Sequence, residues 1–515
     1  MKIDRTKNAT RNIIFAGFLK IYQTIIPFLM RTTMIYFMGV QYLGLNSLFT
    51  SILQVLNLAE LGVGSAMVYS MYKPIAEDDT LSICVLLKLY KLYYRIIGIV
   101  IGMVGLFFTP FIPYLVKSDL PSELNIYVLY LLNLSATVCT YWLFAYKNSL
   151  FEAHQRIDIT SKISVLMNTI KFSFQFIVIL FTKSFYLYII VALLSQIITN
   201  IITAIIATKK YPDYLPKGKL SKEATKEINL RIKDLFTAKL GGVILNSADS
   251  VVISSFLGLT ILAIYQNYYF IVTSIIGVVS IIFQSCTAGI GNSIIVETPE
   301  KNFNDFLKFD FLISWLAGFC TCCLLCIFQP FMKIWVGEKL MMDMSVVVCF
   351  CVYYFIYEIN HLLNTYKDAA GIWHTDRFRP LVTSVSNLIM NLVLVQFWGV
   401  YGVLLSTVIA TLFIGMPWLV HNLFSTLFGR DKIKIYLSKQ FTYGVVILAA
   451  NYVCYRVCAT VDIDGIAKIG FNLIICFIIY NLIFVLFFRK SKEHQECFSM
   501  INRIVGSMLK VKMNK

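Results

Sequence analysis

The sequence predicts an all-α integral membrane protein with about fourteen transmembrane helices, and three observations support this fold class. Of the 515 residues, 58% are hydrophobic and 14% are charged, whereas soluble proteins average about 45–50% and about 25%. The mean hydropathy is +0.73. Apolar runs long enough to cross the roughly 30 Å hydrocarbon core recur along the whole chain. These observations exclude a soluble enzyme, a nucleic-acid-binding protein and a disordered scaffold.

Six apolar runs precede a polar interval at 208–234, and eight follow it. Each run predicts one membrane-spanning helix, because an unpaired backbone is not tolerated in the hydrocarbon core. The runs are 13–38, 43–70, 86–116, 124–148, 159–182, 185–207, 236–258, 261–290, 306–330, 341–367, 380–398, 400–425, 437–459 and 467–488.

The basic residues are distributed unequally between the two sides of the predicted spans. The net charge of +17 comes from 45 Lys+Arg against 28 Asp+Glu. Most basic residues outside the runs fall in even-numbered loops and at the two ends, which predicts a cytoplasmic N-terminus and C-terminus. The basic residues of the odd-numbered loops are Lys117, Lys183, Lys333, Lys339 and Lys468.

Several segments resemble one family of membrane transporters. The segments that carry this resemblance are Arg31–Tyr36, Tyr42–Leu45, Leu58–Gly64, Tyr72–Ala76, Ala369–Trp373 and Gly399–Val403. They are similar to bacterial polysaccharide-unit flippases of the multidrug/oligosaccharidyl-lipid/polysaccharide exporter superfamily, whose members carry O-antigen, capsule or related units.

The resemblance implies an architecture and an activity. It implies two six-helix lobes in a V, plus two C-terminal helices, in the bacterial cytoplasmic (inner) membrane. It also implies alternating-access export of undecaprenyl-pyrophosphate-linked oligosaccharides, alongside membrane lipid and with a polysaccharide polymerase and a chain-length regulator as further partners. The expected divisions are 1–207 (N-terminal lobe), 208–234 (basic cytoplasmic linker), 235–428 (C-terminal lobe), 429–490 (two further spans) and 491–515 (basic tail).

Basic residues inside the predicted spans are the candidate substrate ligands. Charges at membrane depth are costly and seldom face lipid. Lys20 and Arg31 are eleven residues apart, about 16 Å along one helix face. We expect these two and Lys239 to bind the pyrophosphate between the lobes, with Arg95 recruiting it at the cytoplasmic mouth. The alternative is that Lys20 and Lys239 extend to the membrane surface.

Buried acidic groups raise the question of the energy source. Glu60, Asp249 and the pair Glu358 and His361 lie within predicted spans, the last two one helical turn apart. They either couple transport to a proton or sodium gradient or form structural pairs. The membrane potential is a further candidate driving force, and no cofactor is expected.

The thirteen cysteines, four of them at Cys320, Cys322, Cys323 and Cys326, are expected to pack helices rather than to bind a metal ion. Two rival functions remain open. One is a cation-coupled exporter of drugs or other small molecules from the same superfamily. The other is an enzyme, a polysaccharide polymerase or ligase, but the short outer loops offer few acid–base groups and we assign no catalytic residue.

Overall fold

The computed structural model describes residues 5–117, 120–497 and 499, and this part of the chain is helical with no strand. The predicted all-α fold class is therefore confirmed. The helices of the first half are α1 (Arg5–Phe37), α2 (Val40–Leu56), α3 (Val63–Ala76), α4 (Thr80–Phe108), α5 (Ile126–Trp142), α6 (Asn148–Ala153), α7 (Ile157–Phe181) and α8 (Phe185–Lys210).

The second half continues with longer helices. They are α9 (Lys222–Leu257), α10 (Leu259–Val296), α11 (Pro299–Val336), α12 (Met344–Ala369), α13 (Arg379–Ile409), α14 (Met416–Leu423), α15 (Lys432–Ala459), α16 (Ile466–Ile475) and α17 (Asn481–Phe488). Side-chain caps fix several starts: Asp79, Ser184, Ser221 and Thr298 each accept a backbone N–H from the first turn of the helix that follows.

The predicted count of fourteen spans is not confirmed. Ten helical segments in the described residues are long and apolar enough to cross a membrane, or eleven if the pair Ile126–Trp142 and Ala145–Ala153, bent by 50°, forms one span. The predicted span at 43–70 is broken: α2 has 17 residues and is followed by a short 3₁₀ turn, Asn57–Glu60, before α3 begins.

The segment Arg379–Phe428 accounts for two predicted spans in one continuous stretch of 50 residues. Gly399 interrupts α13 with φ 55° and ψ −135°, a conformation that residues with a Cβ rarely adopt. Hydrogen bonds join the two sides of this break, from the Asn387 amide to Thr407 Oγ1 (2.9 Å) and from the Ser406 hydroxyl to Asn391. The stretch is therefore a helical hairpin whose turn lies where the runs 380–398 and 400–425 meet.

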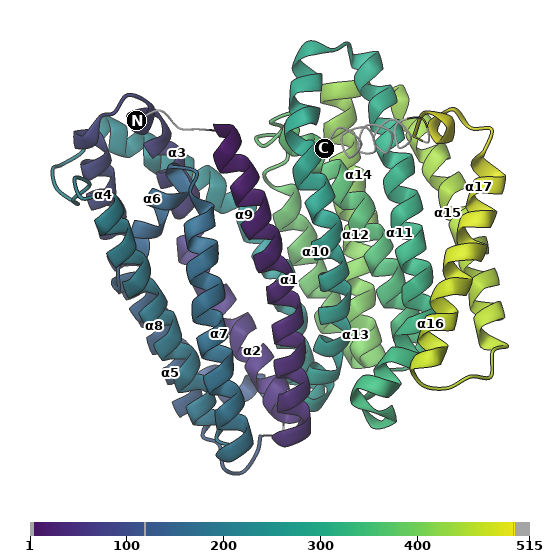
Figure 1. The fold of residues 1–515 in the computed structure, drawn as a ribbon, viewed down its shortest axis with the longest axis horizontal. Coiled ribbons are helices and arrows are strands. Elements are labelled where there is room, and N and C mark those ends of the chain that lie inside the picture. The colour runs from purple at the N-terminus through teal and green to yellow at the C-terminus, as the bar shows by residue number, and fades with distance from the viewer. Residues whose placement is uncertain (1–4, 118–119, 498, 500–515) are drawn as a thin grey trace, which may run out of the picture. The chain divides into compact units, whose positions relative to one another are not determined.

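The chain folds into two compact units. The first contains residues 1–267 with 395–399, and the second contains 268–394 with 400–515. The division thus falls inside α10, whereas the sequence leads us to expect it at the basic interval 208–234. In the first unit α1 packs on α7, α7 on α8, α4 on α5 and α2 on α9; Figure 1 shows α4, α5, α7 and α8 as neighbouring long helices.

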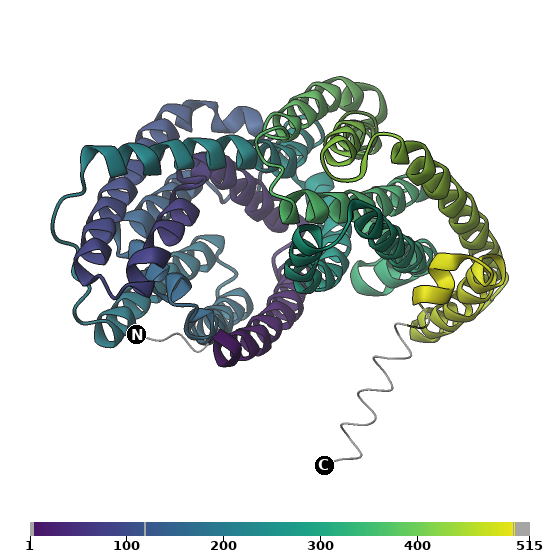
Figure 2. The ribbon, with the colours of Figure 1, turned by 90° about the horizontal axis from the view of Figure 1, so that it is seen from above.

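The second unit is built around α11, which packs on α12, α15 and α16. Its core is strongly aromatic, with the rings of Phe306, Phe424 and Tyr436 in mutual contact at centroid distances of 5.3–5.9 Å. Figure 2 shows α15, α16 and α17 together at one edge of this unit. The predicted pair of additional C-terminal spans corresponds to α15 and to α16 with α17.

Candidate functional site

Arg31 lies on α1, one turn after Pro27, which is inside the helix. Its guanidinium is partly buried within the first unit and donates from Nη1 to the Gln266 carbonyl and to Asn267 Oδ1, both at 3.4 Å. These two bonds are long and both acceptors are neutral. These two contacts bring the positive group to the first turns of α10.

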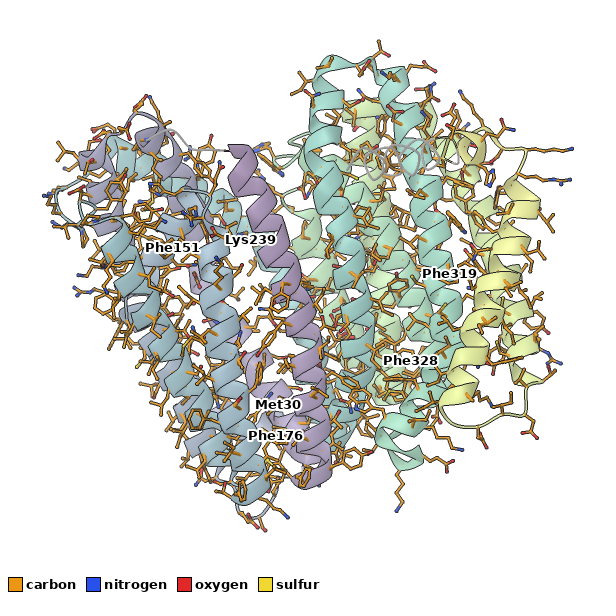
Figure 3. The ribbon with its side chains drawn as sticks, in the orientation of Figure 1. Met30, Phe151, Phe176, Lys239, Phe319 and Phe328 are labelled. Atoms are coloured by element: carbon orange, nitrogen blue, oxygen red, sulfur yellow. The ribbon has the colours of Figure 1, made fainter. Side chains whose placement is uncertain are left out.

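Lys20 and Lys239 have exposed side chains. The Lys20 carbonyl accepts a hydrogen bond from Thr24 Oγ1 at 3.1 Å, as is common for threonine in a helix. Lys239, labelled in Figure 3, lies on α9 and donates from Nζ to Ser65 Oγ on α3 at 3.0 Å. The Lys239 ammonium therefore contacts a neutral hydroxyl, and the Arg31 guanidinium contacts two neutral oxygens of the first unit.

Arg95 has an exposed side chain on α4, and its carbonyl accepts from Trp142 Nε1 at 3.3 Å. It lines a cavity of about 890 Å³ between α4 and the first half of α9, together with six lysines. Sequence reasoning selects Arg95 but does not identify this surrounding group of cations.

Glu60 is held by a chain of tyrosines. Tyr94 donates to Oε1 and Tyr141 to Oε2, both at 2.6 Å, and Tyr90 donates to the Tyr94 hydroxyl at 2.7 Å. Distances of this length are typical of O–H···O⁻ bonds to an ionised carboxylate. In the described residues these hydrogen bonds to Glu60 come from neutral hydroxyls, and its predicted role in ion coupling or structural pairing stays a prediction.

The Glu60 carboxylate also lines a polar cavity of about 480 Å³ inside the first unit. Glu152 on α6 lines the same cavity and accepts from Asn148 Nδ2 at 3.1 Å. Sequence reasoning misses Glu152, because the predicted span ends at residue 148. The polar pair at positions 148 and 152, one helical turn apart, is the signal that could have found it.

Asp249 is buried on α9. Its Oδ2 accepts a hydrogen bond from the hydroxyl of the buried Tyr265 on α10, at 3.1 Å. This contact joins consecutive helices across the break at Gly258, so Asp249 has a structural partner in the first unit.

Glu358 and His361 do meet, as their spacing predicts. His361 Nδ1 is 3.8 Å from Glu358 Oε2 on α12 in the second unit. Both Glu358 oxygens are fully buried and have no hydrogen-bond partner in the part of the chain that the structure describes. The Phe283 ring covers the imidazole at a centroid distance of 4.2 Å. A carboxyl group in this position is costly to ionise.

The second unit also contains a polar network that sequence reasoning misses. Arg379 donates to both oxygens of Asp376, at 2.7 and 2.8 Å, and to Asn364 Oδ1 at 2.9 Å. Asn422 on α14 donates to the same Asp376 carboxylate at 3.1 Å. The network fixes the connection between α12 and α13, which follows the Ala369–Trp373 segment.

Three thiols in the second unit come close together. The sulfur atoms of Cys322 and Cys326 on α11 and of Cys476 lie within 4.8 Å of one another, and all three residues are buried. Cys322 and Cys326 are one helical turn apart, which places them on one face. The helix-packing role expected for the cysteines stays a prediction.

Comparison with solved structures defines the class of protein. The fold is similar to that of the lipid II flippase MurJ in an inward closed conformation, with a TM-score of 0.70 and 16% identity over 93% of this chain and 99% of that one. It is also similar to an inward-facing multidrug resistance transporter of the MATE family (TM-score 0.60, 13% identity, 78% and 93% of the two chains). A transporter of the same MOP superfamily from Pyrococcus furiosus matches with a TM-score of 0.52 and 13% identity, over 81% and 94% of the two chains. The fold is therefore that of the MOP superfamily of membrane transporters.

Sequence comparison then gives the family. The profile of the polysaccharide biosynthesis protein family matches residues 9–288, and the chain belongs to this family. A search of curated proteins finds no match. The family and the structural relatives are transporters and flippases, not enzymes.

Proposed function

We propose that this protein translocates undecaprenyl-pyrophosphate-linked oligosaccharides across a membrane for the synthesis of surface polysaccharide. The observation that carries the proposal is that two cations of the first unit, Arg31 and Lys239, donate to neutral oxygens at 3.4 and 3.0 Å. The third cation, Lys20, has an exposed side chain on the same helix as Arg31. A diphosphate that replaces these contacts exchanges a neutral partner for its own negative charge. Arginine supplies two parallel donors to phosphate oxygens, and lysine supplies a mobile point charge.

The membership of the polysaccharide biosynthesis family supports this substrate class. The similarity to a lipid II flippase supports a lipid-linked substrate. The distribution of basic residues supports insertion in the bacterial inner membrane with both termini cytoplasmic. The proposed partners are a polysaccharide polymerase and a chain-length regulator, which would receive the exported units.

The test is reconstitution of the full chain in proteoliposomes with a fluorescent undecaprenyl-pyrophosphate-linked disaccharide. Accessibility of the label to an external quencher measures its movement between leaflets. We expect Arg31→Ala to reduce the rate at least about tenfold, because a charge-assisted hydrogen bond contributes about 1.5–3 kcal/mol, and Arg31→Lys to retain part of it. The matched control is Arg456→Ala, which removes an exposed arginine of α15. Wild-type rates for Arg31→Ala at normal insertion would contradict the proposal.

A cation-coupled exporter is the second candidate, and the cavity lined by Glu60 and Glu152 favours it. Two carboxylates that line one polar cavity can attract a proton or a metal cation. The same proteoliposomes under imposed proton and sodium gradients separate the two functions. Uptake of an organic cation, lost in Glu152→Gln and insensitive to Arg31→Ala, would favour this second function.

A further inference from the structure

A second cationic feature of the first unit lies away from the predicted ligands on α1. The cavity of about 890 Å³ is bounded by α4, by residues 216–220 and by the first half of α9. Its cationic lining consists of Lys88, Lys91, Arg95, Lys219, Lys222, Lys226 and Lys233.

Helical spacing explains how these charges come together. On α4, Lys88, Lys91 and Arg95 are three and four residues apart and therefore share one face. On α9, Lys222 and Lys226 share a face in the same way. Two cationic helix faces thus point into one space.

Specific contacts hold the two helices in this arrangement. The Tyr93 hydroxyl on α4 donates to Asn229 Oδ1 on α9 at 2.7 Å. Cys84 Sγ on α4 donates to the carbonyl of Asp213, in the segment before α9, at 3.4 Å. Gly218 has φ +90°, and a Cβ there would lie 2.5 Å from Val85 Cγ2, so this turn approaches α4 as closely as glycine allows.

The charge of the cavity is uncompensated by the residues that form it. No Asp or Glu is among its lining residues, and none of its seven cations has an ion pair within the described ranges. Glu227 on α9 pairs instead with Arg231 at 3.3 Å, outside the lining. Like charges gathered in one space repel one another and favour binding of an anion.

The remaining lining residues narrow the class of anion. Val85, Leu89, Leu92 and Leu230 supply an apolar surface beside the lysines. A nucleotide would need aromatic or amide groups to receive its base, and the lining offers no aromatic ring and one amide, Asn229, which is already bonded to Tyr93. An anion with a hydrocarbon chain satisfies both parts of the cavity.

We propose that this cavity binds the phosphate group of a lipid, with the phosphate among the lysines and the chain against the leucines. The lipid is either an anionic phospholipid or the isoprenoid diphosphate end of the transported substrate. The second source rests on the proposed function, whereas the first is independent of it.

The test measures binding to the purified full-length protein in a neutral detergent by thermophoresis. The probes are a short-chain phosphatidic acid, farnesyl diphosphate and inorganic pyrophosphate. We expect the triple variant K88Q/K91Q/K226Q to weaken binding of the two lipid probes at least tenfold. The matched control is K333Q/K339Q/K468Q, which removes three lysines of the second unit and is expected to bind as the wild type does. The single variant Lys226→Glu, at an exposed position of α9, repeats the test with a smaller risk to folding.

The probes separate the two sources. A Kd for farnesyl diphosphate at least tenfold below that of phosphatidic acid supports a substrate-recruiting site, and similar values support a phospholipid site. Equal binding of inorganic pyrophosphate and the lipid probes would overturn the role of the apolar surface. Unchanged binding in the triple variant and in Lys226→Glu would overturn the proposal entirely. Because no transport is measured, these outcomes do not depend on the disaccharide assay.

Discussion

Replacement of Glu60 tests whether the tyrosine chain around this carboxylate stabilises the first unit. Each carboxylate oxygen accepts one hydroxyl, from Tyr94 or from Tyr141, at 2.6 Å. In Glu60→Gln the amide oxygen can keep one of these bonds. The amide nitrogen cannot accept the other, so that hydroxyl must turn, and Tyr141 still has Asn57 Oδ1 at 3.1 Å as an acceptor.

The expected cost follows from the change in bond type. A hydrogen bond to a charged group contributes about 1.5–3 kcal/mol and a neutral one about 0.5–1.5 kcal/mol. Two bonds lose their charge, so Glu60→Gln should lower the free energy of unfolding by about 2 kcal/mol. Glu60→Ala removes both acceptors and leaves one hydroxyl of the Tyr90–Tyr94 pair without one, which should cost about 3–5 kcal/mol.

The assay is reversible unfolding of the purified protein in bicelles, with Glu227→Gln as the control. Glu227 forms an exposed pair with Arg231 one turn away on α9, and such pairs contribute about 0.3–0.5 kcal/mol. A loss for Glu60→Gln no larger than for this control would refute the reasoning. A stable Glu60→Gln protein with abolished transport would assign the carboxylate to transport instead.

Three further perturbations have defined outcomes. Gly44→Ala should destabilise the first unit by more than about 2 kcal/mol, because its Cβ would lie 2.1 Å from the Leu259 carbonyl oxygen. The same unfolding assay measures this loss, and an unchanged free energy of unfolding would contradict the close contact between α2 and α10. Arg379→Met should cost about 2–3 kcal/mol, since it removes two short hydrogen bonds to the buried Asp376 carboxylate and leaves it only Asn422 at 3.1 Å and Lys367 Nζ at 3.7 Å. The double variant D376N/R379M should recover part of the loss. Burial lowers the pKa of His154 below its usual 6.5, so stability contributed by the neutral imidazole is present above about pH 6.5 and is lost as the pH falls. The Tm of thermal unfolding should therefore change less between pH 7 and pH 5 in His154→Gln than in the wild type. An equal change in Tm for the two proteins would contradict the role of the His154 imidazole.

The helices can be predicted from the sequence because hydrophobicity over some twenty residues is a local property. The boundary between the runs 380–398 and 400–425 coincides with the turn at Gly399 for this reason. The breaks are harder to predict: the run 43–70 contains the 3₁₀ turn at Asn57–Glu60, where Asn57 and Glu60 are only single polar positions within an apolar run.

Partners of the polar residues cannot be predicted in the same way, since they depend on packing between distant segments. Glu60 is recognisable as a charge within a span, but its donors lie 34 and 81 positions away. Glu358 and His361 are predictable as neighbours because one helical turn separates them. Asp376 and Arg379 lie between apolar runs, where charged residues usually need no partner, so the sequence does not mark them as a buried pair.

Lys239 in the first unit and three lysines of the second unit have different partners, and this difference bears on the proposed substrate. In the second unit Lys301, Lys308 and Lys439 each meet a carboxylate at 2.5–2.9 Å. In the first unit Lys239 meets a serine hydroxyl, and the Glu60 carboxylate is satisfied by tyrosines. An anion binding at Lys239 would thus exchange a neutral partner or water for its own charge, whereas at the three lysines of the second unit it would have to break an ion pair. The contact of Lys239 with a neutral hydroxyl therefore supports the negatively charged substrate that we propose.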